Sequence, residues 1–322
     1  MPLSESDEAR FFVRLWTAAG RVLRERAEKT KGVLLMTLGW IGLGHMGVPM
    51  ALRLRQAGHQ VNVYNRTVEK TASLVKEGAV ALESPRAVVE QSDIIFLMLA
   101  DGPAITAVFE QEDGLLTSAL SGKTLINLST ISPEQSIMFA ERAEQIGATY
   151  IEAPVSGSVG VAEAGQLVLL LGGDEQAIAA CRPYFEILGK ESIHFGAHGT
   201  GSSAKLAINL LLALVGEGVA ETLLLGERAG LDKNKLLQLI GASGMNTPLF
   251  QGKQTMYREE KFPPAFPLRL MAKDLGLITE EAKRLTLDLP LATTANKQYQ
   301  NALEEGHGDE DMAAIYLALK KN

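Results

Sequence analysis

The chain has 322 residues, of which 46% are hydrophobic and 21% are charged, values typical of a soluble globular protein with room for two domains. Its formal net charge of -7 argues against nucleic acid or an anionic membrane as the main partner. A single cysteine, Cys181, excludes an internal disulfide and favours a reducing, cytoplasmic location.

The first segment, residues 1–35, differs in composition from the rest of the chain. It mixes arginines and acidic residues around Phe11, Phe12, Leu15 and Trp16. Organelle transit peptides are usually poor in acids, which argues against that interpretation. We therefore expect a charged extension over residues 1–35, or an upstream start codon, ahead of an ordered enzyme that begins near Met36.

From Met36 onward, short apolar runs alternate with helical stretches that begin at Thr67, Ser84 and Ser132-Pro133. This alternation predicts an α/β fold of the Rossmann type over residues 36–198, with a doubly wound, mostly parallel sheet. The expected strands cover residues 36–43, 60–64, 93–99, 124–128, 150–154, 167–171 and 192–195.

A glycine-rich loop follows the first expected strand and opens the next helix. It consists of Gly42, Leu43, Gly44, His45, Met46 and Gly47. Glycines at this spacing permit a tight turn, let the backbone approach a pyrophosphate and let the helix pack closely on its strand. Because the strand and helix lie where the fingerprint requires them, the loop predicts dinucleotide binding.

The second expected strand ends in Asn65, Arg66 and Thr67, without the acid that usually binds the ribose hydroxyls of NAD. Asn65 does not repel a 2′-phosphate, and Arg66 can bind one with its planar guanidinium. Thr67 can donate a hydroxyl and cap the next helix. We expect NADPH as the cofactor, with NADH less favoured; the alternative is that Arg66 is a solvated surface residue.

Apolar runs typical of strands end near residue 198. In residues 199–322 the apolar residues recur at the spacing of a helix, which predicts a second, all-helical domain. This domain opens with a long apolar helix that ends near Gly230, and its central apolar run, residues 210–215, is too short to span a bilayer. Lys205 lies in this helix with Asn209 one turn later on the same face. Lys205 is the candidate proton donor; a lysine whose head reaches water is the alternative.

Five segments of the chain resemble the β-hydroxyacid dehydrogenases, and most closely the glyoxylate and succinic semialdehyde reductases in that family. These segments are residues 42–51, 65–67, 152–158, 199–209 and 273–274. The resemblance extends from Met36 to the end of the chain. It implies a dinucleotide domain, a long inter-domain helix, a helical domain often used for dimerisation, and an active site in the cleft between the domains.

The resemblance also implies roles for individual residues. Ser156, Gly157 and Ser158 would bind the substrate carboxylate, for which hydroxyls and unobstructed N–H groups are suited, although the third position is more often glycine in the family. The other implied positions are Leu99, Thr130 and Lys273 for the cofactor and Asn209, Phe266 and Asp274 for the substrate. Core packing of Phe266 and a solvated Lys273-Asp274 ion pair are the alternatives.

The implied reaction is the reduction of a small carboxylate-bearing aldehyde, such as glyoxylate or succinic semialdehyde, by NADPH with Lys205 as general acid. Dehydrogenases or reductases acting on 3-hydroxyisobutyrate or tartronate semialdehyde are alternatives within the family. A catalytically silent dinucleotide-binding protein would tend to lose the lysine, and an imine reductase typically carries another residue there.

The sequence also carries expectations about metals and partners. The five histidines show no metal-ligand spacing, so we expect no catalytic metal. Beyond the small-molecule substrate, we expect a second copy of the chain as partner, in a homodimer or homotetramer. The reason is that a long apolar helix would otherwise expose its surface to water.

Overall fold

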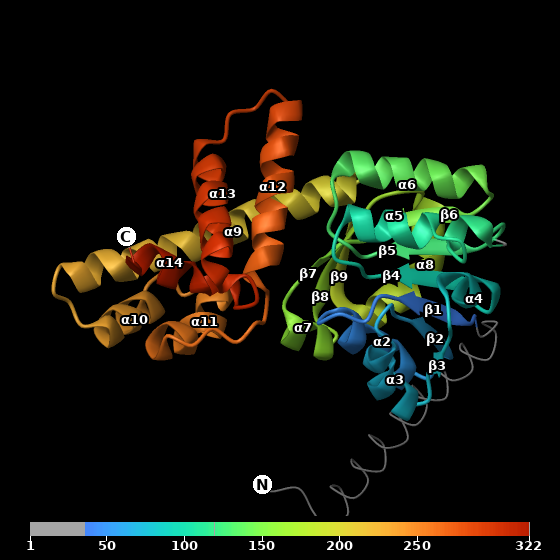
Figure 1. Cartoon of the computed structure of the whole chain (residues 1–322), viewed down its shortest axis with the longest axis horizontal. Coiled ribbons are helices and arrows are strands. Elements are labelled where there is room, and N and C mark those ends of the chain that lie inside the picture. The colour runs from blue at the N-terminus through green and yellow to red at the C-terminus, as the bar shows by residue number, and fades with distance from the viewer. Residues whose placement is uncertain (1–35, 119, 322) are drawn as a thin grey trace, which may run out of the picture.

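The computed structural model describes residues 36–118 and 120–321, and the expected extension over residues 1–35 lies outside this part of the chain. Two structural parts follow one another: an α/β part and a part built from helices. Helix α9 (Thr200–Arg228) begins in the first and runs into the second (Figure 1).

Six parallel strands form the main sheet, in the order β3-β2-β1-β4-β5-β6. Their bounds are β1 Leu38–Ile41, β2 Val61–Tyr64, β3 Val80–Ala81, β4 Ile94–Leu97, β5 Thr124–Asn127 and β6 Thr149–Glu152. The strand order reverses between β1 and β4, and ligands of such sheets bind outside the carboxyl ends of the strands at this point. The sheet confirms the predicted Rossmann-type fold.

A second, three-stranded sheet is present that the sequence pattern did not predict. In it β7 (Val155–Ser156) runs antiparallel to β8 (Leu167–Leu171), and β8 runs parallel to β9 (Gly189–His194). The strand expected over residues 150–154 is present as β6 but ends two residues earlier, because the chain leaves the main sheet at Glu152 and pairs in the second sheet from Val155. Pro154 lies at this break and has no N–H for a ladder.

Helices cover both faces of the main sheet. One face packs against α4 (Pro85–Glu90), α5 (Gly102–Glu110) and α6 (Pro133–Gln145), and the other against α2 (Gly47–Gln56), α3 (Ala72–Lys76) and α8 (Glu175–Leu188). The remaining short elements are α7 (Val159–Glu163) and the 3₁₀ or π turns Val68–Thr71, Leu115–Thr117, Leu303–His307 and Met312–Ala314.

The predicted helix starts can be compared with the observed caps. The Ser84 hydroxyl accepts from Ala87 N, and Ser132 forms a capping box with Gln135, so both starts are confirmed. The cap expected at Thr67 was wrong, because its side chain makes no capping hydrogen bond with the 3₁₀ turn that follows.

The helical part has one apolar core around α9, as predicted for an all-helical second part. Its other helices are α10 Lys233–Ala242, α11 Pro248–Glu259, α12 Leu268–Arg284, α13 Pro290–Ala302 and α14 Ile315–Lys321. In Figure 1, α12 and α13 stand side by side across α9. The packing places α12 next to the α/β part, where it contributes to the site described below.

The apolar run at residues 210–215 predicts a segment too short to span a bilayer, but the helix that contains it, α9, is much longer than this run. With 29 residues it is long and apolar enough, by length and composition, to cross a membrane. Such a helix can also be the core helix of a soluble protein. Here it buries Lys205, Asn209 and Glu217 and packs against β8, α12, α13 and α14, so we interpret it as the helix that joins the two parts.

Candidate active site

The glycine-rich loop lies at the carboxyl end of β1, at the point where the strand order reverses. Gly42 has a φ of +101°, and a Cβ built there would lie 2.3 Å from the carbonyl oxygen of Met98. A Cβ on Gly47 would lie 2.1 Å from the carbonyl oxygen of Gly42. Around Gly44, by contrast, no atom of the described chain lies within 4 Å of the added Cβ. The turn and the helix packing therefore require Gly42 and Gly47, whereas Gly44 leaves space for a pyrophosphate.

The first turn of α2 is suited to an anion. It has no capping side chain and no acidic residue, so no charge of its own offsets the positive end of its dipole. His45, which is exposed, and Met46, which packs partly buried against the core, directly precede α2, whereas the Leu43 side chain is buried in the core. These features fit the phosphates of a nicotinamide dinucleotide.

The residues after β2 have two different roles. Asn65 holds the loops together: its Oδ1 accepts from Leu43 N at 2.9 Å, and its Nδ2 donates to the Thr67 carbonyl at 2.8 Å. Arg66 is exposed and forms no ion pair within the chain that the structure describes, so its guanidinium is free to bind a phosphate. Thr67 is also exposed.

Lysine 273 of α12 contacts the loops that follow β4 and β5. Lys273 Nζ donates to the carbonyl oxygens of Thr130 at 2.7 Å and Ala100 at 3.2 Å. Beside them, Leu99 N donates to Ser129 Oγ at 2.9 Å. The predicted cofactor residues Leu99, Thr130 and Lys273 are thus brought together at the carboxyl edge of the main sheet.

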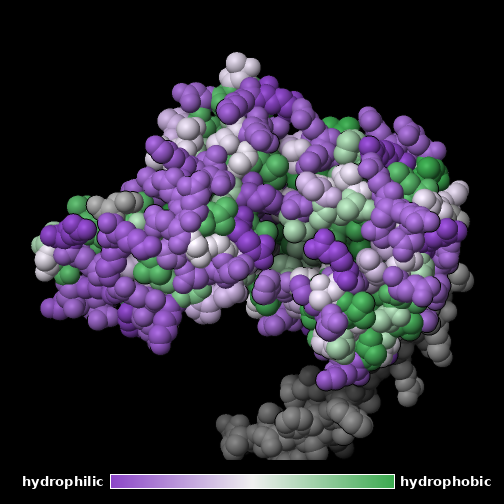
Figure 2. Space-filling model, in the orientation of Figure 1, coloured by the Kyte–Doolittle hydropathy of each residue, from purple (hydrophilic) through white to green (hydrophobic). Residues whose placement is uncertain are grey.

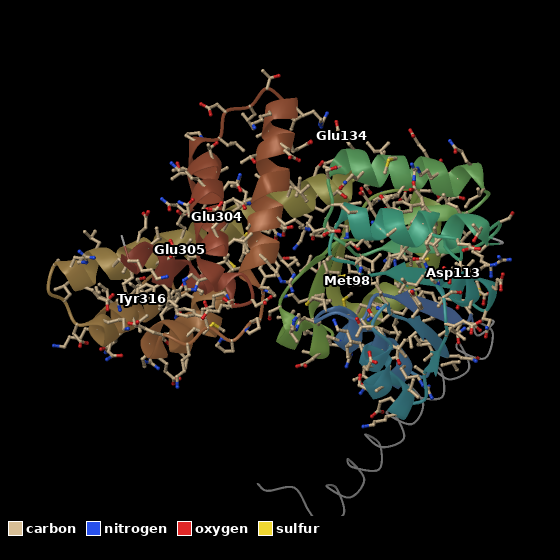
Figure 3. All side chains as sticks on the ribbon, viewed as in Figure 1. Met98, Asp113, Glu134, Glu304, Glu305 and Tyr316 are labelled. Carbon is tan, nitrogen blue, oxygen red and sulfur yellow. The ribbon has the colours of Figure 1, made fainter. Side chains whose placement is uncertain are left out.

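The space-filling view shows the surface hollowed between the α/β part and the helical part (Figure 2). Met98, at the end of β4, lies toward the helical part, and Glu134 lies beside α12 (Figure 3). The Glu134 carboxylate is 3.6 Å from Arg284 Nε, so an ion pair joins the two parts at the end of α12. The end of β4 and the end of α12 therefore lie where the two parts face each other.

Four side chains form a connected polar group next to this hollow. Lys205 Nζ donates to Asn209 Oδ1 at 3.0 Å, and Asn209 Nδ2 donates to Asp274 Oδ2 at 2.6 Å. Lys273 Nζ is 2.9 Å from Asp274 Oδ1 as an ion pair, at angles outside those of a hydrogen bond. Lys205 is only 9% exposed and Asp274 only 2%, so neither a water-reaching lysine nor a solvated ion pair describes this group.

The surroundings of Lys205 change its acidity. Burial lowers the pKa of Lys205 to about 8, against an opposing effect from the charge of Asp274 and a smaller lowering by the charge of Lys273. A lysine with this pKa is still protonated at neutral pH but gives up its proton more readily than a surface lysine. Its hydrogen bond to Asn209 fixes the direction of Nζ.

The predicted carboxylate-binding turn follows β7. Gly157 has a φ of +144°, and a Cβ there would lie 2.7 Å from Leu167 Cδ2 and 2.8 Å from Val161 Cγ1. Ser156 and Ser158 are half-buried, and Ser158 makes no capping hydrogen bond with α7. The turn lies at the edge of the α/β part that faces the helical part in Figure 1, where its hydroxyls can meet an anion.

Phe266 lies in the loop before α12, half-buried against the helical core, so packing accounts for at least part of its position. Its N–H donates to Asp311 Oδ2 at 3.0 Å, and Asp311 is a fully buried carboxylate paired with Lys253. Phe250, a second aromatic residue that could have bordered the cleft, is instead part of the core.

Two buried acids, Asp311 and Glu152, are not among the predicted site residues. An acid within the apolar strand β6 was the available signal for Glu152, whereas Asp311 directly follows Asp309 and Glu310 and does not stand out in the sequence. Glu152 accepts hydrogen bonds from the first turn of α9. Among residues 36–118 and 120–321 the structure has no group of three or more His, Cys, Asp or Glu residues that could hold a metal ion.

Comparison with known proteins covers both parts of the chain. A family model described as the NAD binding domain of 6-phosphogluconate dehydrogenase matches residues 37–196. A second, described as the NAD-binding of NADP-dependent 3-hydroxyisobutyrate dehydrogenase, matches residues 199–319. Together the two matches span nearly all of the described residues.

Individual proteins are similar over the same range. Glyoxylate/succinic semialdehyde reductase 1 of Arabidopsis thaliana is 35% identical over 285 residues, 88% of this chain and 99% of that protein. The 2-hydroxy-3-oxopropionate reductase of Escherichia coli is 37% identical over 286 residues, 88% of this chain and 97% of that protein. The structure of Mycobacterium tuberculosis 3-hydroxyisobutyrate dehydrogenase with L-serine has a TM-score of 0.79 at 29% identity, over 89% of this chain and 100% of that one.

Proposed function

This chain belongs to the β-hydroxyacid dehydrogenase family and is an NAD(P)-dependent oxidoreductase of that type, and from this premise we propose that it reduces small carboxylate-bearing aldehydes with NADPH. The proposed substrates are glyoxylate and succinic semialdehyde, which become the corresponding hydroxy acids. The observation that carries the proposal is the buried series of hydrogen bonds from Lys205 through Asn209 to Asp274, next to the loops that follow β4 and β5.

A bound nicotinamide dinucleotide supplies the hydride that is added to the aldehyde carbon. Lys205 donates the proton from Nζ to the aldehyde oxygen, where negative charge develops, and so stabilises the transition state more than the ground state. Asn209 directs Nζ, and the charge of Asp274 favours the protonated lysine. The Ser156 and Ser158 hydroxyls bind the substrate carboxylate.

The test is a substrate panel with purified protein and NADPH, followed by the loss of absorbance of the reduced nicotinamide. Glyoxylate and succinic semialdehyde are expected to support turnover, whereas acetaldehyde, which lacks the carboxylate, is expected to react poorly. If no carboxylate-bearing aldehyde oxidises NADPH, the proposal fails and a silent dinucleotide-binding protein becomes the better description.

A second candidate function comes from the same comparisons. The 37% identical relative from Escherichia coli is named for 2-hydroxy-3-oxopropionate, and the family model that matches residues 199–319 is described for 3-hydroxyisobutyrate dehydrogenase. Both compounds carry a carboxylate near the reacting carbon, and the same lysine would donate the proton in reduction and accept it in oxidation. We therefore include tartronate semialdehyde in the panel with NADPH and test 3-hydroxyisobutyrate in the oxidative direction with NADP+. Within each direction the highest kcat/KM identifies the preferred substrate.

We propose that NADPH is preferred over NADH because Arg66 is exposed and free at the end of β2, where no acid is present. Arg66→Asp is expected to lower the ratio of kcat/KM for NADPH over NADH about 100-fold, since a charge-assisted pair contributes about 2 to 3 kcal/mol. Arg86→Asp is the control, because Arg86 is an exposed arginine on α4 that pairs with Glu90. An unchanged ratio in the Arg66 variant would contradict the assignment.

We also propose that the protein forms a homodimer or homotetramer through α9. Ile208, Leu211 and Leu225 lie on one side of this helix with 41%, 56% and 74% of their surface exposed. Leu211→Glu is expected to shift the mass measured by light scattering toward that of one chain. Leu291→Glu, on α13, is the control and should leave the mass unchanged. A monomeric wild-type protein would exclude the proposal.

A further inference from the structure

The side chain of Glu152 lies against the first turn of α9. Its Oε1 accepts from Gly201 N at 2.7 Å, and its Oε2 accepts from Ser202 Oγ at 2.8 Å and from Ser136 Oγ at 2.6 Å. Ser202 N is a longer donor, at 3.4 Å from Oε2. Glu152 is 1% exposed, and within the described chain no cation pairs with it. Hydrogen bonds alone therefore balance the burial of this carboxylate.

The surrounding backbone is shaped to admit this carboxylate. A Cβ on Gly172 would lie 1.9 Å from Glu152 Oε1, and a Cβ on Gly201 would lie 2.5 Å from the carbonyl oxygen of Leu170. The backbones of Glu152 and Gly172 also exchange hydrogen bonds at 3.1 and 3.0 Å. Glu152 thus joins the main sheet, the second sheet and α9 at one point.

Buried polar side chains continue from Glu152 toward the cofactor loops. The Ser136 hydroxyl acts on that of Tyr150, which accepts from Asn127 Nδ2 at 2.8 Å. Asn127 Oδ1 in turn accepts from Ser129 N at 3.0 Å, directly before Thr130. Every side chain in this network is buried. A buried polar network of this kind holds the groups it connects in one arrangement.

We propose that Glu152 is a positioning residue, which anchors the first turn of α9 to the α/β part and thereby sets the location of Lys205 Nζ relative to the cofactor loops. Gly201 and Ser202 precede Lys205 by four and three residues, so all three lie within about one helical turn. A tilt or rotation of this turn moves Lys205 directly. The inference rests on the proposed role of Lys205 as proton donor.

Glu152→Gln tests the inference because it keeps the side-chain volume but replaces one acceptor oxygen by an amide donor. We expect kcat for reduction to fall about 10- to 100-fold, since a displacement of about 1 Å at a reacting group can cost 100-fold. The KM for NADPH should change little, because the glycine-rich loop does not contact Glu152. This split between kcat and KM separates positioning of Lys205 from a general loss of the site.

The pH profile gives a second readout. Loosening the first turn of α9 admits water to Lys205, whose pKa is lowered by burial, so the alkaline limb of kcat/KM should move to higher pH. The charged groups that act on Lys205 are Asp274 and Lys273, both on α12, and neither is altered by the substitution.

Two further variants complete the design. Gly172→Ala, whose Cβ would displace the Glu152 carboxylate, should reproduce the lower kcat and the shifted limb. Ser84→Ala, which removes the capping acceptor of α4, is the control and should lower thermal stability without changing kcat or the limb.

The outcomes separate the two hypotheses. If Glu152→Gln and Gly172→Ala lower Tm as Ser84→Ala does but leave kcat and the alkaline limb unchanged, Glu152 is only structural and the inference is overturned. If both variants fail to fold, Ser202→Ala decides, because it removes one donor and should give a smaller effect in the same direction. If Lys205→Ala itself leaves turnover unchanged, the proposed function fails instead.

Discussion

Lys205→Ala is expected to lower kcat for aldehyde reduction by about 100- to 10,000-fold, the range typical of a positioned general acid. The affinity for NADPH should be nearly unchanged, because the glycine-rich loop and Arg66 lie on other elements. Steady-state kinetics give kcat, and a titration that follows nicotinamide fluorescence gives the dissociation constant. Lys283→Ala is a matched control, since Lys283 is an exposed lysine near the end of α12. Wild-type turnover in the Lys205 variant would rule out this lysine as the acid.

The same lysine should determine the pH profile of the wild-type enzyme. In the proposed mechanism, reduction needs protonated Lys205, whose pKa burial lowers to about 8. The kcat/KM for reduction should therefore hold below that value and fall as the pH rises through it. Oxidation of the hydroxy acid needs the neutral amine and should show the opposite dependence. Asp274→Asn removes a charge that raises the pKa of Lys205, so its alkaline limb should move to lower pH.

Gly42→Ala is expected to lower the free energy of unfolding by about 2 to 5 kcal/mol, through strain at positive φ and forced overlap. The overlap is with backbone, since the new Cβ would lie 2.3 Å from the carbonyl oxygen of Met98, and a carbonyl cannot rotate away as a side chain can. Dinucleotide binding should be lost with the shape of the loop. Denaturant unfolding and a binding titration measure the two effects.

Gly44→Ala is the matched comparison for Gly42→Ala. Its Cβ would meet no atom of the described chain within 4 Å, and Gly44 is not among the glycines at positive φ, so stability should be close to that of the wild type. NADPH binding should nevertheless weaken, because the methyl group occupies space left for the pyrophosphate. If Gly44→Ala binds NADPH normally, or Gly42→Ala is as stable as the wild type, the proposed cofactor loop is wrong.

Local sequence signals predicted much of the architecture. Apolar runs identified seven of the nine strands near their observed positions, because a strand buried on both faces must be apolar along its length. Ser84 and Ser132 marked helix starts because their hydroxyls satisfy N–H groups that the helix itself leaves free. The two-residue strands β3 and β7 were missed, since elements of that length have no period to detect.

In the candidate site, too, features within one element could be predicted from the sequence, whereas contacts between distant elements could not. The sequence by itself determined that Lys205 and Asn209 share one helix face and that glycines line a strand-to-helix turn, because spacing within one element follows from backbone geometry. Only the tertiary structure decided that Asp274 accepts from Asn209, 65 residues away, and that Glu152 meets the first turn of α9. Those contacts depend on how helices and sheets pack against one another, which no local periodicity encodes.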